Sequence, residues 1–294
     1  MSMHEFFRKL LSPASSIKRH LESRNSLRTE RDALASERIS LMRQIEELKM
    51  KGSIRTAIGT PTYDADFLTV WNKNTDFLKD PHFMQAYREG MNSGHKIGRP
   101  AGSDLDIHIE WRILVCCWAG WHAKQLSGDF VECGTNTGIM SLAICNYINF
   151  NATGKNFFLF DTFQGMPEDQ ILPEERTLGR HLENAMYEDC YERACSNFKP
   201  FPKAQLIKGK VPDTLETQNI NQVCYLMLDM NMVVPELAAI EYFWDKLVKG
   251  AIVLFDDYGW LAYIQQKKAM DSFAANKGVK ILTLPTGQGL LIKP

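Results

Sequence analysis

From residue 129 to the end of the chain, short apolar runs alternate with longer stretches in which apolar residues recur at helical spacing. A short continuous apolar run bounded by glycine or charge is typical of a strand that is buried on both faces. Such runs predict strands at 129–133, 156–160, 204–208, 223–228 and 251–255, and a closing pair at 279–284 and 289–292. Helical spacing predicts helices over 107–126, 138–149, 180–198, 235–248 and 260–275. This alternation predicts an α/β fold: a doubly wound, mainly parallel sheet with helices on both faces and an antiparallel strand at its end.

The N-terminal region has a different pattern. Residues 17–50 are almost free of Gly and Pro, and leucines recur every seven residues, at Leu27, Leu34, Leu41 and Leu48. A leucine seam favours a helix that pairs with itself or with a partner as a coiled coil. The companion positions hold Arg24, Arg31, Arg38 and Ile45, which leaves a single charged helix with solvated faces as the alternative. We therefore predict an N-terminal helical, possibly coiled-coil extension over residues 1–60.

Residues 61–126 form the predicted helical cap and lead-in to the core, which spans 127–294. Glycines gather near residues 90–102, and a loop of that composition beside a site often acts as a lid. A plain surface loop explains the same composition equally well.

Composition narrows the class of protein. The 294-residue chain is 45% hydrophobic and 23% charged with a net charge of −1, which gives no reason to expect nucleic acid as a partner. No apolar run reaches the length of about 18 residues that a membrane span requires. The seven cysteines show no paired spacing and fall mostly in apolar elements. Together with the lack of a signal-peptide pattern, they lead us to expect a cytoplasmic protein with reduced cysteines.

Acidic residues end four of the predicted strands: Glu132, Asp161, Asp229 and the pair Asp256–Asp257. In open α/β sheets, ligands bind outside the carboxyl ends of the strands. A carboxylate at the edge of a buried strand is costly unless it has a partner. Capping of the following helices could account for one or two of these acids. The full set indicates ligands that bring hydroxyls, cations or a metal.

The first strand runs into a glycine turn, Gly134-Thr135-Asn136-Thr137-Gly138, and then into an apolar helix. Such a turn presents backbone N–H groups and a helix N-terminus to a ligand. Asp161 follows the second strand, where a nucleoside site accepts ribose hydroxyls. The dinucleotide fingerprint G-x-G-x-x-G is absent, and the acid at Glu132 together with the closing antiparallel hairpin favours S-adenosylmethionine over a nicotinamide cofactor.

The remaining acids suit a metal. Asp229, Asp256 and Asp257 follow two adjacent strands and offer the hard oxygen ligands that Mg²⁺ or a similar ion prefers. A metal there could lower the pKa of a substrate hydroxyl, and Asp229 could take the proton.

Five segments carry a resemblance to a known family. They are Asp129–Gly138 (DFVECGTNTG), Leu159–Pro167 (LFDTFQGMP), Lys208–Leu215 (KGKVPDTL), Leu228–Asn231 (LDMN) and Val253–Gly259 (VLFDDYG). With them, the chain from about residue 62 to 294 resembles the macrocin O-methyltransferase family of class I S-adenosylmethionine-dependent methyltransferases. The resemblance implies a seven-stranded, Rossmann-like methyltransferase fold. It also implies methyl transfer to a hydroxyl of a sugar, a glycosylated metabolite or a glycan.

We therefore expect an enzyme with S-adenosylmethionine and Mg²⁺ as cofactors. The resemblance implies a metal held by carboxylates matching Asp229, Asp256 and Asp257, with Asp229 also as the catalytic base. The predicted cofactor-binding residues are Glu132, Gly134, Thr135, Asn136, Gly138, Asp161, Thr162, Phe163, Lys208 and Gly209. The chain departs from the family pattern after the fourth strand, where Asn231 and Val233 replace an acid and a tyrosine. Asn231 can still offer an oxygen ligand, but the wall of the substrate site must differ.

Two other functions remain open. The first is a catalytically silent, methyltransferase-like scaffold that binds a partner or a second copy of the chain through the helix at 17–50. The second is a nicotinamide-dependent sugar oxidoreductase, which the glycine pattern disfavours. His108 and Arg112 could position substrate and His181 could act as a second base, although ordinary exposed positions explain all three.

Overall fold

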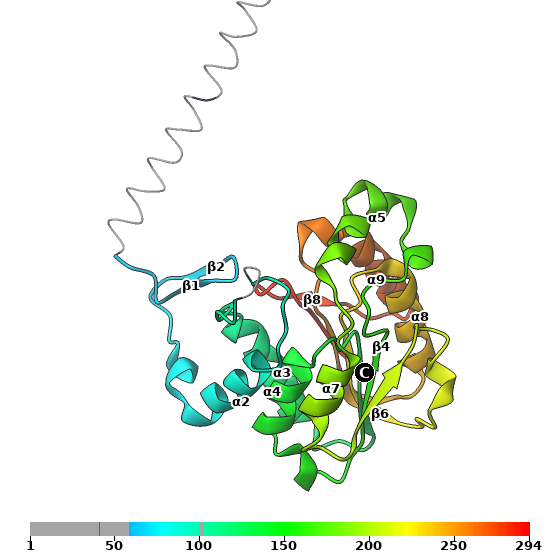
Figure 1. Cartoon of the computed structure of the whole chain (residues 1–294), viewed down its shortest axis with the longest axis horizontal. Helices are drawn as coiled ribbons and strands as arrows, with labels where there is room; N and C mark the ends of the chain where they lie inside the picture. Colours follow the sequence, from blue (N-terminus) through cyan, green and yellow to red (C-terminus); the bar gives the residue numbers. More distant parts are fainter. Residues whose placement is uncertain (1–40, 42–58, 100–102) are drawn as a thin grey trace, which may run out of the picture. The chain divides into compact units, whose positions relative to one another are not determined.

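The computed structural model describes residue 41 and residues 59–99 and 103–294. Residues Thr62–Pro294 form one compact unit (Figure 1). Its main sheet has seven strands in the order β5-β4-β3-β6-β7-β9-β8, and a separate hairpin consists of β1 and β2. Strands β3 to β7 run parallel to one another, while β9 pairs antiparallel with both β7 and β8. The predicted fold class, a seven-stranded, mainly parallel, doubly wound sheet, is confirmed.

The strands are β1 Tyr63–Ala65, β2 Leu68–Val70, β3 Asp129–Cys133, β4 Phe157–Asp161, β5 Ala204–Lys208, β6 Val223–Leu228, β7 Leu247–Phe255, β8 Leu282–Thr283 and β9 Gly289–Ile292. The α-helices are α2 Pro81–Met91, α3 Glu110–Ala123, α4 Ile139–Tyr147, α5 Pro173–Thr177, α6 Arg180–Glu183, α7 Tyr191–Phe198, α8 Val233–Trp244 and α9 Ile264–Asn276. Short 3₁₀ helices are η1 Asp76–Lys79, η2 Phe150–Ala152, η3 Glu168–Gln170, η4 Asn184–Met186, η5 Leu215–Thr217 and η6 Leu261–Tyr263. Among the helices described, none is both long and apolar enough to cross a membrane.

Side chains that alternate along the central strands build two cores, one on each face of the sheet. Phe130 and Leu159 belong to the core that contains the buried residues of α2, α3 and α4, while Val131 and Phe158 belong to the core that contains those of α8 and α9. Figure 1 shows the first group of helices in cyan to green and the second in yellow to orange. Because both faces are covered, central strands such as β6 are buried along their whole length, which explains their continuous apolar runs.

The strand order positions a binding crevice. The first strand of the core, β3, lies between β4 and β6, so the chain moves outward in one direction from β3 to β5 and in the other from β6 onward. A point where the strand order reverses leaves an opening at the carboxyl ends of the two strands. The crevice between β3 and β6 is therefore the place where a ligand is expected from topology alone.

The predicted helix over 180–198 is wrong. The chain forms α6 and η4, runs in extended conformation at Tyr187, and then starts α7 at Tyr191. Asn184 explains the break: its side-chain amide donates to the carbonyl of Met166 at 2.8 Å and accepts from the Met166 N–H at 2.8 Å. These two bonds tie the segment to the loop after β4, and they satisfy polar groups that a continuous helix would leave unpaired.

The predicted helix over 235–248 is too long. Helix α8 ends at Trp244, and β7 begins at Leu247, which pairs with Val223 of β6. The Lys246 carbonyl accepts the Val223 N–H at 2.8 Å. The apolar residues after Trp244 continue the helical spacing, but they pair with β6 as a strand. Strand pairing thus overrides their weak local preference for a helix.

The cap contains one element that its sequence pattern does not indicate, the hairpin β1–β2. Its turn consists of Asp66 and Phe67, both with positive φ. The predicted coiled coil over 17–50 lies outside the described residues except for position 41, and the division into domains at residues 60 and 126 stays a prediction.

Candidate active site

The glycine turn after β3 is packed too closely for any other residue. Gly134 has φ +96°, and a Cβ atom built on it would lie 1.9 Å from the Asp229 carbonyl oxygen. Gly138 has φ +95°, and its added Cβ would lie 2.5 Å from the ring of Phe198. The two glycines therefore let the turn lie against the end of β6 and against α7, so that α4 starts at the edge of the crevice.

Asp161, at the end of β4, is bound by the backbone of two loops. Its carboxylate accepts the Asn136 N–H at 2.7 Å from the glycine turn and the Phe163 N–H at 2.5 Å from the loop after β4. Burial nevertheless raises the pKa of this carboxyl above its usual value, and the backbone donors act in the opposite direction. These bonds join the two strand ends on the β3–β4 side of the crevice.

Glu132 and Thr135 offer unsatisfied polar atoms beside the turn. Burial raises the pKa of the Glu132 carboxyl to about 8. In the part of the chain that the structure describes, Glu132 Oε2 and Thr135 Oγ1 are buried without a hydrogen-bond partner. Buried polar atoms are normally paired, and both residues line the cavity described below, so these atoms are available to a polar ligand.

The β6–β7 side of the crevice carries the three other acids. Burial first, and then the charges of the neighbouring carboxylates, raise the pKa values of Asp229 and Asp257 well above their usual range. Asp256 has fixed partners: it accepts from Arg112 at 2.9 Å and from the Gln288 amide at 3.1 Å. Asp257 Oδ2 has no hydrogen-bond partner among the described residues. This side of the crevice therefore holds more carboxyl groups than its own donors pair.

A cavity of about 640 Å³ unites the two sides. The predicted residues that line it are Glu132, Gly134, Thr135, Asn136, Asp161, Thr162, Phe163, Gly209, Asp229, Asp256 and Asp257. Gly138 does not line it and acts instead at the start of α4. Lys208 does not line it either, because its ammonium lies 3.6 Å from an Asp189 carboxylate oxygen and 4.7 Å from the centre of the Tyr191 ring.

Other lining residues were not predicted. They include Asp66, Phe67, His95, Met166, Tyr187, Trp260 and Tyr263. Burial, with the nearby charges of Arg99 and Arg112, lowers the pKa of His95 to about 4, so this imidazole is neutral at neutral pH. Met166 lies within the LFDTFQGMP segment, but no sequence signal marks Asp66 or Phe67. The predicted lid region contributes His95, Ile97 and Gly98 to the lining, and its role as a lid stays a prediction.

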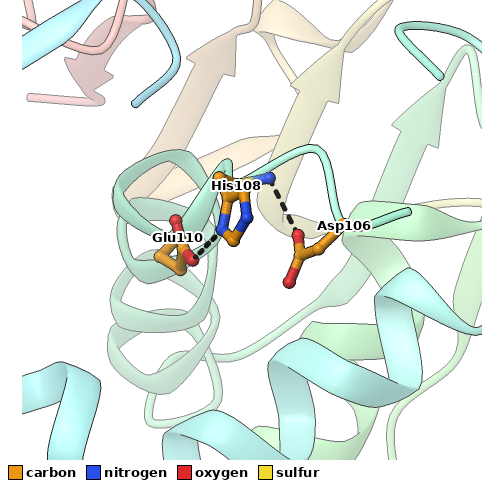
Figure 2. Close-up of side chains that lie close together, drawn as sticks. All are labelled: Asp106, His108 and Glu110. Atoms are coloured by element: carbon orange, nitrogen blue, oxygen red, sulfur yellow. Dashed lines mark hydrogen bonds and ion pairs between the residues drawn. The ribbon is translucent and has the colours of Figure 1, made fainter. Parts of the chain in front are cut away.

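The three polar residues proposed for substrate or base roles have different surroundings. Arg112 lines the cavity, whereas His108 and His181 do not. His108 belongs to a cluster with Asp106 and Glu110 (Figure 2), the one group of three possible metal ligands in the described residues whose ligand atoms lie within 4.8 Å of one another. Its carboxylates already accept protein donors: Asp106 bonds the Tyr87 hydroxyl and the His108 N–H, and Glu110 bonds the Tyr63 hydroxyl and the His108 imidazole. The cluster thus ties the hairpin β1–β2 to the start of α3.

The sequence and the structure of the chain are similar to those of known proteins. The family model described as Macrocin-O-methyltransferase (TylF) matches residues 112–283. A curated relative from Streptomyces olivaceus is 24% identical over 143 residues, covering 46% of this chain and 55% of that protein. Its name is 8-demethyl-8-(2,3-dimethoxy-alpha-L-rhamnosyl)-tetracenomycin-C 4'-O-methyltransferase. The match thus spans about half the length of the curated relative.

Among solved structures, that of the O-methyltransferase NovP has a TM-score of 0.60 and 18% identity, and the match covers 72% of this chain and 97% of NovP. The calicheamicin methyltransferase CalS11 has a TM-score of 0.49 and 16% identity, with 75% of this chain and 98% of CalS11 covered. At this level of identity the similarity to NovP shows the fold.

Proposed function

The chain belongs to the macrocin O-methyltransferase (TylF) family, and from this premise we propose that it transfers the methyl group of S-adenosylmethionine to a hydroxyl of a sugar, a glycosylated metabolite or a glycan. One observation carries the proposal: a single cavity at the β3–β6 switch point joins a glycine turn and Asp161 to the carboxylates of Asp229, Asp256 and Asp257. The first set suits a nucleoside, and the second suits a metal and a hydroxyl. A methyltransferase needs the two side by side.

The β3–β4 side suits S-adenosylmethionine. Asp161 would accept the ribose hydroxyls, and Glu132 and Thr135 would pair the amino-acid end of the cofactor. The unpartnered Glu132 Oε2 and Thr135 Oγ1 support this assignment. Gly134, Asn136, Thr162, Phe163 and Gly209 line the same cavity and would contact the cofactor through backbone and van der Waals surfaces. Gly138 would act through the turn geometry.

The carboxylate oxygens on the β6–β7 side are the type of ligand that Mg²⁺ or a similar ion prefers. Asp229, Asp256 and Asp257 provide hard oxygen ligands on one cavity wall, and Asp257 Oδ2 has no protein donor among the described residues. Their oxygens do not form a group within 4.8 Å in the described residues, so simultaneous ligation requires these side chains to approach one another. When bound, such an ion supplies charge that orients the acceptor and lowers the pKa of its hydroxyl.

The chain's own residues would do the rest. Asp229 would accept the hydroxyl proton as the O–H bond breaks, and its buried position favours taking a proton. When bound, S-adenosylmethionine would supply an electrophilic methyl group to the acceptor oxygen and would leave as S-adenosylhomocysteine, with the electrons of the broken carbon–sulfur bond on sulfur. Positioning of the two substrates supplies most of the acceleration.

A sugar hydroxyl is the acceptor class we propose because the name of the curated relative specifies a rhamnosyl group. A rhamnoside is therefore the first acceptor to try. Cytoplasmic location and assembly with a partner or a second copy through residues 17–50 stay proposals from the sequence.

Calorimetric titration with S-adenosylhomocysteine, with and without Mg²⁺, tests the proposal on the full chain and on Asp256→Ala. We expect the wild type to bind the nucleoside, and the variant to retain nucleoside binding but lose the effect of Mg²⁺. NAD serves as the control ligand and should not bind. A wild type that binds no S-adenosylhomocysteine contradicts the proposal and favours the scaffold function, whereas NAD binding favours an oxidoreductase.

A further inference from the structure

Helix α3 is apolar on all its faces after its first turn. From Ile113 to Trp121 it holds no charged or hydrogen-bonding side chain except the indoles and thiols. A helix that is apolar all round is normally buried all round. The side of α3 that faces the sheet is buried, but Trp118 and Trp121 on the opposite side are 47% and 52% exposed. The outer side of α3 thus has the composition of a buried surface while it is exposed in the single copy.

The cap covers only the beginning of this outer side. The ring of Trp111, in the first turn of α3, packs against Phe77 and Tyr63, with ring centres 4.6 and 6.3 Å apart. The two exposed tryptophans lie two and three turns further along the helix, beyond these contacts.

The end of α3 lies beside the last strands of the sheet. Trp118 stacks on His122, with the ring centres 5.9 Å apart. His122 Nε2 donates to the carbonyl of Gly250 in β7 at 3.0 Å, and the Gly250 N–H donates to the carbonyl of Lys293 at 2.8 Å. The end of β9 is therefore close to the stacked pair.

The exposed apolar surface continues onto these strands. Ile292 of β9 pairs with Ile252, which belongs to the core on the α3 side of the sheet, so Ile292 projects on that side too. Leu282 of β8 pairs with Leu290 and projects on the same side. Ile292 is 52% exposed and Leu282 59%. We refer to four exposed side chains as the α3 face: Trp118, Trp121, Leu282 and Ile292.

A surface of this kind is typical of a protein contact. Contiguous exposed apolar patches mark interaction sites, and tryptophan is enriched among the residues that contribute most to binding at protein interfaces. None of the four side chains lines the cavity. The α3 face is thus separate from the candidate active site.

The charges at the two ends of α3 indicate which partner fits. Asp104 and Asp106 are exposed just before the helix begins, whereas Lys124 caps its end and the exposed Lys249 precedes Gly250 there. A two-fold axis through the face sets α3 antiparallel to the α3 of a second copy. Each acidic end then lies toward a basic end, which is electrostatically favourable. An anionic lipid surface would attract the lysines but repel the two aspartates.

The sequence before the unit also favours a second copy. The leucines at every seventh position over 17–50 predict a helix that pairs with itself. Residues 51–61 separate this predicted helix from Thr62. So short a connection would hold two units at a high effective concentration, at which a modest interface is occupied.

We propose that the α3 face is a symmetric interface at which a second copy of the chain packs its own α3 antiparallel against this one. Trp118 and Trp121 are its central contacts. The inference does not depend on the proposed function, and it concerns a surface distinct from residues 17–50.

Sedimentation velocity of the full chain at about 50 μM tests the proposal, since a stable dimer has a Kd well below this concentration. The background variant, Leu34→Gln with Leu41→Gln, removes pairing through the leucine seam. We expect it to remain a dimer, and to become a monomer when Trp118→Gln and Trp121→Gln are added. Leu178→Gln with Leu182→Gln is the matched control in the same background, because these leucines are 46% and 68% exposed outside the face; it should stay a dimer.

A monomeric background variant overturns the proposal, and so does a dimer that survives loss of both tryptophans with an unchanged Kd. Co-sedimentation of a monomeric background variant with phosphatidylserine vesicles would assign the face to a lipid surface instead.

The orientation is tested without altering the tryptophans. Lys124→Glu in the same background places a carboxylate toward the acidic end of the partner, twice per symmetric dimer, so we expect the Kd to rise about threefold or more. Far-UV circular dichroism checks that the variant is folded. An unchanged or lower Kd shows that the two helices do not pair antiparallel, and the proposed interface is then wrong.

Discussion

The two sides of the crevice satisfy their buried acids in different ways. On the β3–β4 side, Asp161 accepts two backbone N–H groups, one from the glycine turn and one from its own loop. On the β6–β7 side, Asp229 and Asp257 repel each other and Asp256, and one Asp257 oxygen has no partner in the described residues. The fold therefore pairs Asp161 before any ligand arrives, although Glu132 on the same side keeps one oxygen without a partner among the described residues. The second side keeps several carboxyl groups close together with few donors, the arrangement expected where a cation completes the site.

The largest change in stability is expected on replacing Gly134, which lies against the end of β6 and so joins the two sides of the crevice. Gly134→Ala would place a Cβ 1.9 Å from the Asp229 carbonyl oxygen at a φ of +96°, so we expect a loss of about 3 kcal/mol or more in unfolding free energy. Denaturant unfolding measures it. Gly154→Ala is the control, because φ is +74° but nothing lies within 4 Å of its added Cβ; backbone strain alone should cost about 1 kcal/mol. Equal losses in the two variants would show that the close approach to β6 is unimportant.

Replacing one acid on each side should change stability in opposite directions. Each carboxylate oxygen of Asp161 accepts one backbone N–H, and Asp161→Asn replaces one of these oxygens with an N–H₂ group that cannot accept. We therefore expect the unfolding free energy to fall by about 1.5–3 kcal/mol. Asp257→Asn removes a buried carboxyl group whose ionisation burial and Asp256 disfavour, so in metal-free buffer we expect a gain of about 1 kcal/mol. Thermal unfolding in chelator measures both.

Destabilisation by Asp257→Asn would contradict the contrast between the two sides. With Mg²⁺ and an acceptor present, the same variant should lose methyl transfer while keeping S-adenosylhomocysteine affinity.

The pH dependence of stability should report Glu132. Burial raises the pKa of Glu132 in the folded state to about 8, above its ordinary value of 4.5. Between these two pH values the folded state therefore keeps a proton that the unfolded state has released. Stability should then fall as pH rises from about 5 to 8, by at most about 1.4 kcal/mol per pH unit for this group. Urea unfolding without cofactor over this range checks it. Glu132→Gln should flatten the slope, and an unchanged slope would place the pKa of Glu132 near its ordinary value.

The smallest effect, on the affinity for S-adenosylhomocysteine, is expected on replacing Lys208. Its ammonium lies beside Asp189 and the Tyr191 ring and outside the cavity. An exposed ion pair contributes about 0–1 kcal/mol, so Lys208→Ala should change S-adenosylhomocysteine affinity less than about threefold. A tenfold loss by calorimetry would restore the sequence-based assignment of Lys208 to the cofactor site.

Sequence alone determined the main sheet and much of the site. The strands at 129–133 and 223–228 begin and end where the apolar runs predicted, because a strand buried on both faces needs an apolar run. The strand at 204–208, at the edge of the sheet, also has the predicted bounds. The acids that end β3, β4, β6 and β7 line one cavity, since parallel strands place their carboxyl ends at one edge of the sheet. Such features depend on local pattern and on topology, both of which can be read along the chain.

Only the tertiary structure decided the features that depend on contacts between distant residues. Asn184 ends a helix by bonding Met166, and Leu247 leaves a helical pattern to pair with Val223. Arg112 joins Asp66 to Asp256 across 46 and 144 residues of sequence, and in doing so places Phe67 at the mouth of the cavity. No local pattern encodes these contacts, because the free energy of each comes from a partner whose position exists only after the sheet has formed.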